Sequence, residues 1–198
     1  MHVADSMGFK INTFTHILEG YKVADKMKAH GVAASTFSDW WAYKFEVNDA
    51  IPYNGALLHE VGVLTAFNSD DSEMARRLNQ EAAKAIKYGG VSQEEALKFV
   101  TLNPAKMLHL DHRIGSIKVG KDADVVLWTA NPLSVYATVV KTFVDGLCYY
   151  DAKRDVLMRE EIKKERARLI QKMIKAKKDG EGSQPADFKK PKDLKCGI

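Results

Sequence analysis

Two side chains with metal-binding chemistry, His16 and Asp70, stand where predicted β-strands end. The runs 10–16 and 63–71 are β-prone, and a similar run, 32–38, lies between them. The carboxyl ends of parallel strands meet on one face of a sheet, so we expect His16 and Asp70 to share that face. An imidazole and a carboxylate that converge suit a divalent metal of the zinc type. A carboxylate beside metal-bound water can also accept its proton.

A structural interpretation fits the same two residues. A histidine at a strand end is commonly a packed or hydrogen-bonded structural residue. The sequence Ser-Asp-Asp at 69–71 precedes a predicted helix, where an aspartate would serve as an N-cap. Spacing alone therefore leaves both interpretations open.

The elements that must position these residues alternate regularly along the first half of the chain. Helices are predicted after each β-prone run, over 20–31, 55–62 and 74–90, and from Ser92 to the region of Pro104. Gly31, Gly62 and Gly90 stand where C-terminal caps belong, and Ser92 with Glu95 forms a capping box. Strands that alternate with helices predict βα units around a parallel sheet.

The pattern changes after residue 112. Residues 114–132 and 139–151 read as strands joined by turns without a helix between them, which predicts a small antiparallel element. A long helix is predicted over 153–178, with an apolar stripe, and the residues after Asp179 have the composition of a disordered tail. We therefore divide the chain into 1–112, 113–152, 153–178 and 179–198.

Charge is distributed unevenly. Residues 153–198 hold 15 Lys+Arg against 8 Asp+Glu, a net +7, and the rest hold 15 against 18, a net −3, which together give the +4 of the chain. A basic tail can bind nucleic acid or anionic lipid. Its lysines alternate with glutamates and Phe188 is its one aromatic residue, which favours a solvated helix face. No apolar run reaches the ~20 residues of a membrane helix. We expect neither a nucleic-acid nor a membrane partner.

Two further residues could contact a substrate. Lys44 and Trp40 lie in the aromatic loop, residues 39–54, which follows the run 32–38. This loop would overhang the face that carries His16 and Asp70. The alternative is that the loop only packs on the rim of the sheet. His59 is expected to be structural, because it lies in a predicted helix beside leucines.

Three segments resemble the amidohydrolase superfamily, near its imidazolonepropionase-like and dihydroorotase-like members. FTHILEGYKVADKM resembles the region of the strand-six histidine. FNSDD, with the helices RLNQEAAKAIKYGGVSQEEALKFVTLNPAKML after it, resembles the region of the strand-eight aspartate. RIGSIKVGKDADVVLWTANPL is the most specific segment and resembles the return into the β-sandwich beside the barrel. The resemblance covers about residues 1–151.

This resemblance implies an α/β fold: about strands 6–8 of a TIM-like (β/α)8 barrel, then strands of a small β-sandwich and a C-terminal helix. It implies that His16 is a metal ligand, usually of a second metal. It implies that Asp70 is a metal ligand and the general base, with Asp71 as the runner-up that fits a helix cap better. The cofactor would be one or two divalent metal ions, which we expect to be zinc. The reaction would be hydrolysis of non-peptide C–N bonds in a small molecule, such as a cyclic amide or amidine.

Departures from the family pattern qualify these implications. The His-x-His pair of strand one, the carboxylated lysine of strand four and the histidine of strand five have no counterpart in the chain. We therefore expect a truncated enzyme that is inactive alone, or half of a split enzyme completed by a partner chain or by a homo-oligomer. The alternative is a non-catalytic remnant that serves as an assembly module.

Overall fold

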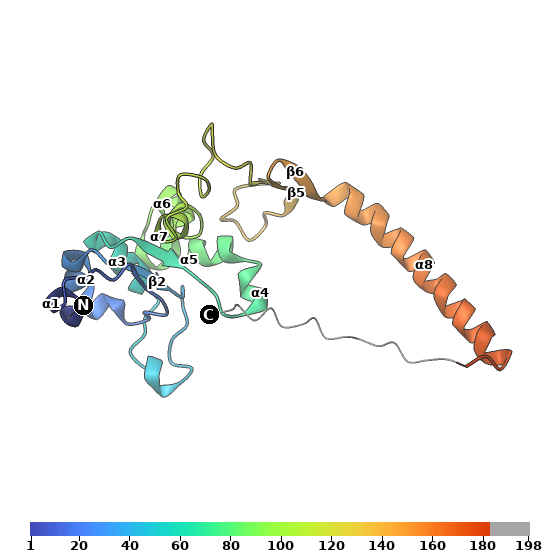
Figure 1. Cartoon of the computed structure of the whole chain (residues 1–198), viewed down its shortest axis with the longest axis horizontal. Coiled ribbons are helices and arrows are strands. Elements are labelled where there is room, and N and C mark those ends of the chain that lie inside the picture. Colours follow the sequence, from blue (N-terminus) through green and yellow to red (C-terminus); the bar gives the residue numbers. More distant parts are fainter. Residues whose placement is uncertain (183–198) are drawn as a thin grey trace. The chain divides into compact units, whose positions relative to one another are not determined.

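The computed structural model describes residues 1–182, which form two units. The first spans Met1–Asp151, and the second begins at Ala152. Figure 1 shows the chain coloured from the N-terminus to the C-terminus. Each unit is described by itself below.

A three-stranded parallel sheet lies at the centre of the first unit. Its strands are β1 (Thr13–Phe14), β2 (Ala33–Thr36) and β3 (Thr65–Phe67), in the order β1-β2-β3. Thr13 pairs with Ala33, and Ala34 pairs with Thr65. The connections run through η1 (Gly20–Val23) with α2 (Ala24–His30), and through η2 (Phe45–Val47) with α3 (Asn54–Val61). The predicted βα alternation and the α/β class are confirmed, although each strand is shorter than its β-prone run.

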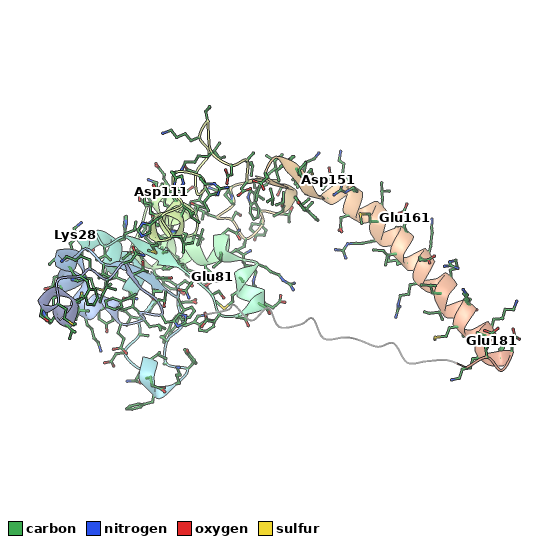
Figure 2. The ribbon with its side chains drawn as sticks, viewed as in Figure 1. Lys28, Glu81, Asp111, Asp151, Glu161 and Glu181 are labelled. Carbon is green, nitrogen blue, oxygen red and sulfur yellow. The ribbon has the colours of Figure 1, made fainter. Side chains whose placement is uncertain are left out.

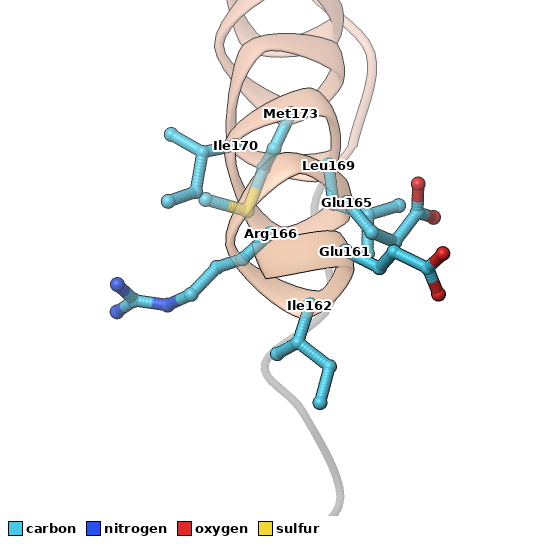
Figure 3. Close-up of a pocket in the computed structure, with 7 residues that line it drawn as sticks. All are labelled: Glu161, Ile162, Glu165, Arg166, Leu169, Ile170 and Met173. Carbon is cyan, nitrogen blue, oxygen red and sulfur yellow. The ribbon is translucent and has the colours of Figure 1, made fainter. Parts of the chain in front are cut away.

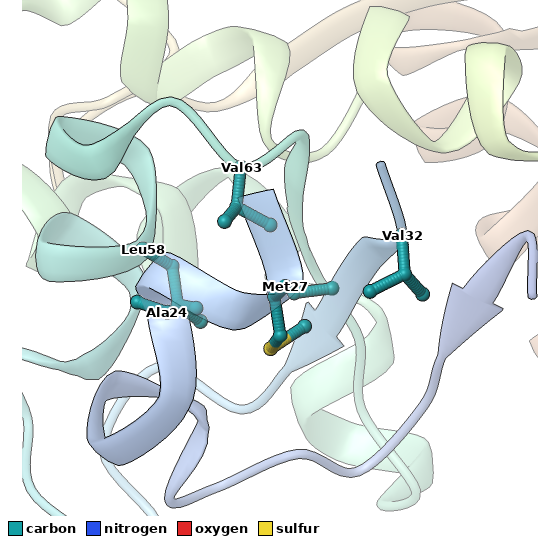
Figure 4. Packing of buried hydrophobic residues seen from close by; sticks show 6 residues of the cluster. Ala24, Met27, Val32, Leu58 and Val63 are labelled. Atoms are coloured by element: carbon teal, nitrogen blue, oxygen red, sulfur yellow. The ribbon is translucent and has the colours of Figure 1, made fainter. Parts of the chain in front are cut away.

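Helices α2 and α3 cover β2 and bury one core cluster. Met27 and Leu58 are fully buried there against Ala34, together with Val32 and Val63 (Figure 4). Both helices end at a glycine in the left-handed region, Gly31 with φ +83° and Gly62 with φ +90°. A side chain would be strained in that conformation, so glycine sets where each helix stops. The predicted caps are confirmed.

The helical region after β3 is more divided than the sequence predicted. It contains α4 (Ser72–Ala75), α5 (Leu78–Gly89), α6 (Gln93–Lys98) and α7 (Leu102–Met107), and α1 (His2–Ser6) lies at the N-terminal end of the unit. The prediction of one continuous helix from Ser92 to the region of Pro104 is wrong, because α6 ends at Lys98 and a new helix begins at Leu102. Pro104 has no amide hydrogen to continue a helix from the preceding turn, but it is tolerated in the first turn of a new one. The continuous helix over 74–90 is also wrong, because the backbone leaves helical geometry at Arg77.

The first unit also holds an antiparallel sheet of β4 (Val125–Trp128), β5 (Val139–Val144) and β6 (Leu147–Asp151), in that order. The predicted antiparallel element is confirmed, but 114–124 forms turns rather than a strand. The side chains of Asp122 and Asp124 stabilise these turns. Asp122 pairs with Arg113 at 2.7 Å, and Asp124 accepts a hydrogen bond from the amide of Asp145.

The described part of the second unit, residues 152–182, contains α8 (Ala152–Lys178) and a short turn. No residue of α8 is buried among the residues that the structure describes, and its side chains project all round the helix (Figure 2). Among residues 1–182, no helix is long and apolar enough to cross a bilayer. Of the tail that was predicted after Asp179, residues 183–198 lie outside the part of the chain that the structure describes. The predicted boundary at 112/113 stays a prediction.

Candidate functional site

His16 lies in a sharp turn directly after β1. Its backbone has φ +56°, a left-handed conformation that is uncommon for a residue with a side chain and costs about 1 kcal/mol. The amide of Ile17 donates to Ser35 O at 3.3 Å, and the amide of Leu18 donates to His16 O at 3.0 Å. The first bond holds the turn against β2, and the second closes the turn itself. A strained residue held by its surroundings is typical of a functional site.

Asp70 lies three residues after β3 and approaches His16 across the end of β2. The distance from His16 Nε2 to Asp70 Oδ1 is 3.3 Å, and both side chains are about half exposed (53% and 54%). The structure therefore brings together the two residues that the sequence placed on one face. Within residues 1–182, no group of three or more His, Cys, Asp or Glu side chains is arranged to hold a metal ion.

The neighbouring carboxylate, Asp71, has a different role. Its Oδ1 accepts hydrogen bonds from the amides of Glu73 and Met74, both at 2.9 Å, as the N-cap of α4. An N-cap aspartate satisfies amide groups that have no partner within the helix. Asp71 is therefore occupied as a cap, in agreement with the interpretation that made it the runner-up to Asp70.

A stack of aromatic rings supports His16. The imidazole lies on Phe37 with 5.3 Å between ring centroids and an interplanar angle of 20°. Phe37 in turn stacks on Trp40 at 4.4 Å and 8°, and Trp40 donates from Nε1 to Met74 Sδ at 3.2 Å. The stack fixes the plane of the imidazole and joins it to the aromatic loop.

A cavity of about 490 Å³ opens beside the pair. Its charged and aromatic lining residues are His16, Glu19, Phe37, Tyr43, Lys44, Glu46 and Asp70. Lys44 thus lies at the cavity, with its ammonium 5.5 Å from the centre of the Tyr43 ring. Trp40 lies behind Phe37 in the stack and is not part of the lining.

Lys22 links the turn after His16 to the aromatic loop through its contacts with Glu19 and Asp49, which we call the clasp. Its ammonium is 2.6 Å from Asp49 Oδ2 and 2.7 Å from Glu19 Oε2, and Tyr21 Oη donates to Asp49 O at 2.8 Å. The hydrogen bonds that Lys22 donates to Asp49 and Glu19 raise the pKa of Lys22. The hydrogen bond and charge of Lys22 lower the pKa of Asp49. The clasp holds one side of the cavity.

Asn54, at the start of α3, is a buried link that the sequence analysis missed. It is 2% exposed, and its Nδ2 donates to Ile17 O at 2.9 Å and to Thr36 Oγ1 at 3.0 Å. Its Oδ1 accepts from the amide of Tyr21 at 2.9 Å. The amide group therefore ties α3 and β2 to the turn that carries His16. No local pattern marks this asparagine, since all its partners are distant in sequence.

A second buried polar group holds the start of the aromatic loop. Ser38 donates to Glu81, and Lys84 lies 2.9 Å from both Glu81 and Asp39. Burial disfavours the charge on Lys84, but the hydrogen bonds that Lys84 donates to Glu81 and Asp39 outweigh this effect and raise the pKa of the lysine. These contacts join α5 to the segment between β2 and Trp40.

Comparison with known proteins identifies the family. The sequence model of the amidohydrolase family matches residues 11–148, so the chain belongs to the amidohydrolase family. The resemblance seen in the sequence is confirmed.

Relatives of the chain are considerably longer than it is. It is 33% identical over 148 residues to an amidohydrolase, tasK, of Hapsidospora irregularis, a match that covers 72% of this chain and 15% of that one. It is 37% identical over 89 residues to the urease alpha subunit of Photorhabdus laumondii, covering 36% and 16%. The chain thus spans a small part of the relatives that it matches.

Solved structures give the same result for the fold. An amidohydrolase from Thermotoga maritima superposes with a TM-score of 0.69 at 31% identity, over 76% of this chain and 39% of that one. Guanine deaminase of E. coli superposes with a TM-score of 0.56 at 19% identity, over 76% and 41%, and shows likeness of fold alone.

Proposed function

We propose that this chain contributes His16 and Asp70 to the metal centre of an amidohydrolase that hydrolyses non-peptide C–N bonds. The observation that carries the proposal is the convergence of the two side chains at the ends of β1 and β3, beside a cavity. Membership of the amidohydrolase family supports the reaction class.

The spacing of the two donor atoms fits a single zinc ion bound by both residues, an arrangement that differs from the second metal that the family resemblance implies for His16. Zinc bonds of about 2.0–2.1 Å at a tetrahedral angle place two ligand atoms roughly 3.3–3.4 Å apart. His16 Nε2 and Asp70 Oδ1 are 3.3 Å apart, beyond the usual length of a direct hydrogen bond. A catalytic zinc usually has three protein ligands and a water. The pair therefore fits as part of a ligand set, and the remaining ligands would come from outside the described residues.

His16 and Asp70 would have different chemical roles. A bound divalent metal would supply hydroxide near neutral pH by lowering the pKa of its water. His16 would donate a lone pair from Nε2, with its ring plane fixed by the stack on Phe37. Asp70 Oδ1 faces His16, so its other oxygen, Oδ2, would accept the proton of the water and return it to the leaving nitrogen.

Lys44 and Trp40 differ in their proposed roles. Lys44 lines the cavity and would contact an acceptor group of the substrate. Trp40 would act indirectly, by holding Phe37 beneath the imidazole. A small cyclic amide or amidine suits a cavity of about 490 Å³ that has aromatic walls.

The fold assignment that goes with this function is equally a proposal. We assign β1, β2 and β3 to strands six, seven and eight of a (β/α)8 barrel, and β4–β6 to the flanking β-sandwich. Superposition on 39% of the Thermotoga maritima amidohydrolase supports this assignment.

Zinc binding by the purified chain tests the proposal. We expect zinc to bind and His16→Ala to weaken its affinity at least about tenfold, because one of two ligands is lost. His112→Ala is the matched control, since His112 is exposed and far along the chain in a turn. Isothermal titration with zinc gives the affinities, and the absorption of Co²⁺ in its place reports the ligands. Equal zinc affinities of His16→Ala and His112→Ala would contradict the proposal for this polypeptide. A folded wild-type chain that binds no zinc would contradict it as well.

A second candidate function is an assembly module without catalysis. It is favoured by the observation that no third metal-binding side chain joins His16 and Asp70 within residues 1–182. It predicts a folded chain that binds no zinc, so the titration above separates the two candidates.

A further inference from the structure

Helix α8 changes its charge character halfway along its length. Residues 152–165 contain five cationic and four acidic side chains, in alternation. Residues 166–178 contain no acidic side chain and six cationic ones: Arg166, Arg168, Lys172, Lys175, Lys177 and Lys178. The alternation of lysine with glutamate, which favoured a solvated face, therefore stops at Glu165.

The same segment has an apolar face. At about 100° per residue, Leu169 and Met173 form one row of the helix surface, and Ile170 and Ile174 form the next. The exposed fractions of these four side chains are 49%, 59%, 38% and 41%. A shallow groove on this face is lined by Leu169, Ile170 and Met173, together with Glu161, Ile162, Glu165 and Arg166 from the preceding turns (Figure 3). The segment is thus a cationic amphipathic helix whose apolar side also carries Arg166 and Lys177.

Arg166 decides between the possible occupants of this face. It stands within the apolar rows, three residues before Leu169 and four before Ile170, and it lines the same groove. In the groove of a protein partner its charge would be buried and would need a specific acidic group. At a lipid surface the long side chain can lie along the apolar face while its guanidinium reaches the headgroups.

Charge also argues against a second copy of the helix. An antiparallel pair would set the +6 of residues 166–178 against the +1 of residues 152–165, and a parallel pair would set +6 against +6. Neither arrangement offers complementary charge. An anionic phospholipid surface complements both the cationic side and the apolar side.

We propose that residues 166–178 of α8 bind in the plane of an anionic phospholipid surface, with Leu169, Ile170, Met173 and Ile174 in the boundary between headgroups and acyl chains. The helix lies on the bilayer and does not cross it. The proposal departs from the expectation of no membrane partner, which rested on the charge pattern of residues 153–198 taken as a whole. The proposal concerns the second unit alone and is independent of the proposed metal centre.

Co-sedimentation of the full chain with vesicles tests the proposal. Vesicles of phosphatidylcholine are compared with vesicles that also contain phosphatidylserine, at low and high salt. The variant is Met173→Glu and its matched control is Leu157→Glu. Met173 and Leu157 are similarly exposed (59% and 67%), but they lie about 160° apart around the helix. Glutamate is a good helix former, so both variants keep the helix, which circular dichroism verifies.

We expect binding to the anionic vesicles only, a steep decrease with salt, and at least about tenfold weaker binding for Met173→Glu than for Leu157→Glu. Equal binding of the two variants, or equal binding to neutral vesicles, would overturn the proposal. So would a failure of the wild-type chain to bind vesicles while it binds soluble polyglutamate, which would indicate an acidic protein partner. A wild-type dimer that Met173→Glu dissociates, without vesicle binding, would show that a second copy occupies the face.

Discussion

Asp70 and Asp71 are neighbours in the chain but have different surroundings. Asp71 is the N-cap of α4 and accepts two backbone hydrogen bonds. Asp70 points to His16 and is half exposed. A capping carboxylate contributes to stability, whereas a carboxylate held beside an imidazole near a cavity is available to a metal. This difference at the scale of single residues can be tested.

We expect Asp71→Ala to lower the free energy of unfolding by about 1 kcal/mol, the usual cost of losing an N-cap. It should leave zinc affinity unchanged, because the side chain faces α4. Asp70→Ala should do the reverse, with lost zinc affinity and little change in stability. Urea unfolding and zinc titration of both variants measure the two effects. The assignment of roles is wrong if Asp71→Ala, and not Asp70→Ala, loses zinc.

Asn54 acts through the turn that carries His16. Asn54→Ala leaves Ile17 O, the Tyr21 amide and the Thr36 hydroxyl without their buried partner. We expect a loss of about 2–3 kcal/mol in the free energy of unfolding, because buried polar groups become unsatisfied. Hydrogen exchange at the amide of Tyr21 should also accelerate.

Asn48→Ala is the control for Asn54→Ala, because Asn48 is exposed and its side chain makes one long hydrogen bond, 3.4 Å to Asp49. It should change stability by less than about 0.5 kcal/mol. Similar losses for the two asparagine variants would contradict the anchoring role of Asn54.

At the scale of elements, the ion pairs of Lys22 with Glu19 and Asp49 join the turn after His16 to the aromatic loop. The hydrogen bond from Lys22 lowers the pKa of Asp49 in the folded chain. An aspartate in an unfolded chain has a pKa of about 3.9. The stabilisation by this contact is therefore fully present above about pH 4, and it is lost as the pH falls through the lower folded pKa. Lys22 keeps its proton throughout, because its pKa is raised.

We therefore expect the aromatic loop of the wild-type chain to loosen as the pH is lowered below about 4. In Asp49→Asn the loop should already be loose at neutral pH, with little further change on acidification. The fluorescence of Trp40 and Trp41 over a pH titration measures this. Glu60→Gln, on an exposed position of α3, should behave as the wild type does. A wild-type profile in Asp49→Asn would show that the clasp does not hold the loop.

Elements defined by local rules could be predicted from the sequence, and those defined by tertiary contacts could not. The βα alternation and the caps at Gly31 and Gly62 follow from periodicity and from the conformational freedom of glycine. The helix that begins after Ser92 was predicted to reach the region of Pro104, but α6 ends earlier, at Lys98, and Pro104 lies in the first turn of α7. His16 and Asp70 could be selected as strand-end residues. The link through Asn54 could not, since its partners lie up to 37 residues away.

At the scale of the whole molecule, the parallel sheet has two open edges. Its strand order leaves β1 and β3 each with one neighbour in the described residues. A strand edge without a neighbour is a site for pairing with another chain. The chain also spans 39% of the length of the Thermotoga maritima amidohydrolase on which it superposes. Both facts support the proposal that further barrel strands, with further metal ligands, complete the site.

This proposal predicts how the 198-residue polypeptide behaves alone and when complemented. Alone, it should bind zinc through no more than His16 and Asp70, with weak affinity, and should hydrolyse no cyclic amide, because a catalytic zinc needs a third protein ligand. Mixing it with a polypeptide that carries the corresponding remainder of an amidohydrolase barrel should give a complex with tighter zinc binding. X-ray absorption counts the ligands, and size-exclusion chromatography with light scattering detects the complex. His16→Ala should form the same complex but bind zinc less tightly, which separates assembly from metal binding. Full hydrolytic activity of the isolated monomeric chain, or a zinc site with three protein ligands in it, would contradict the prediction.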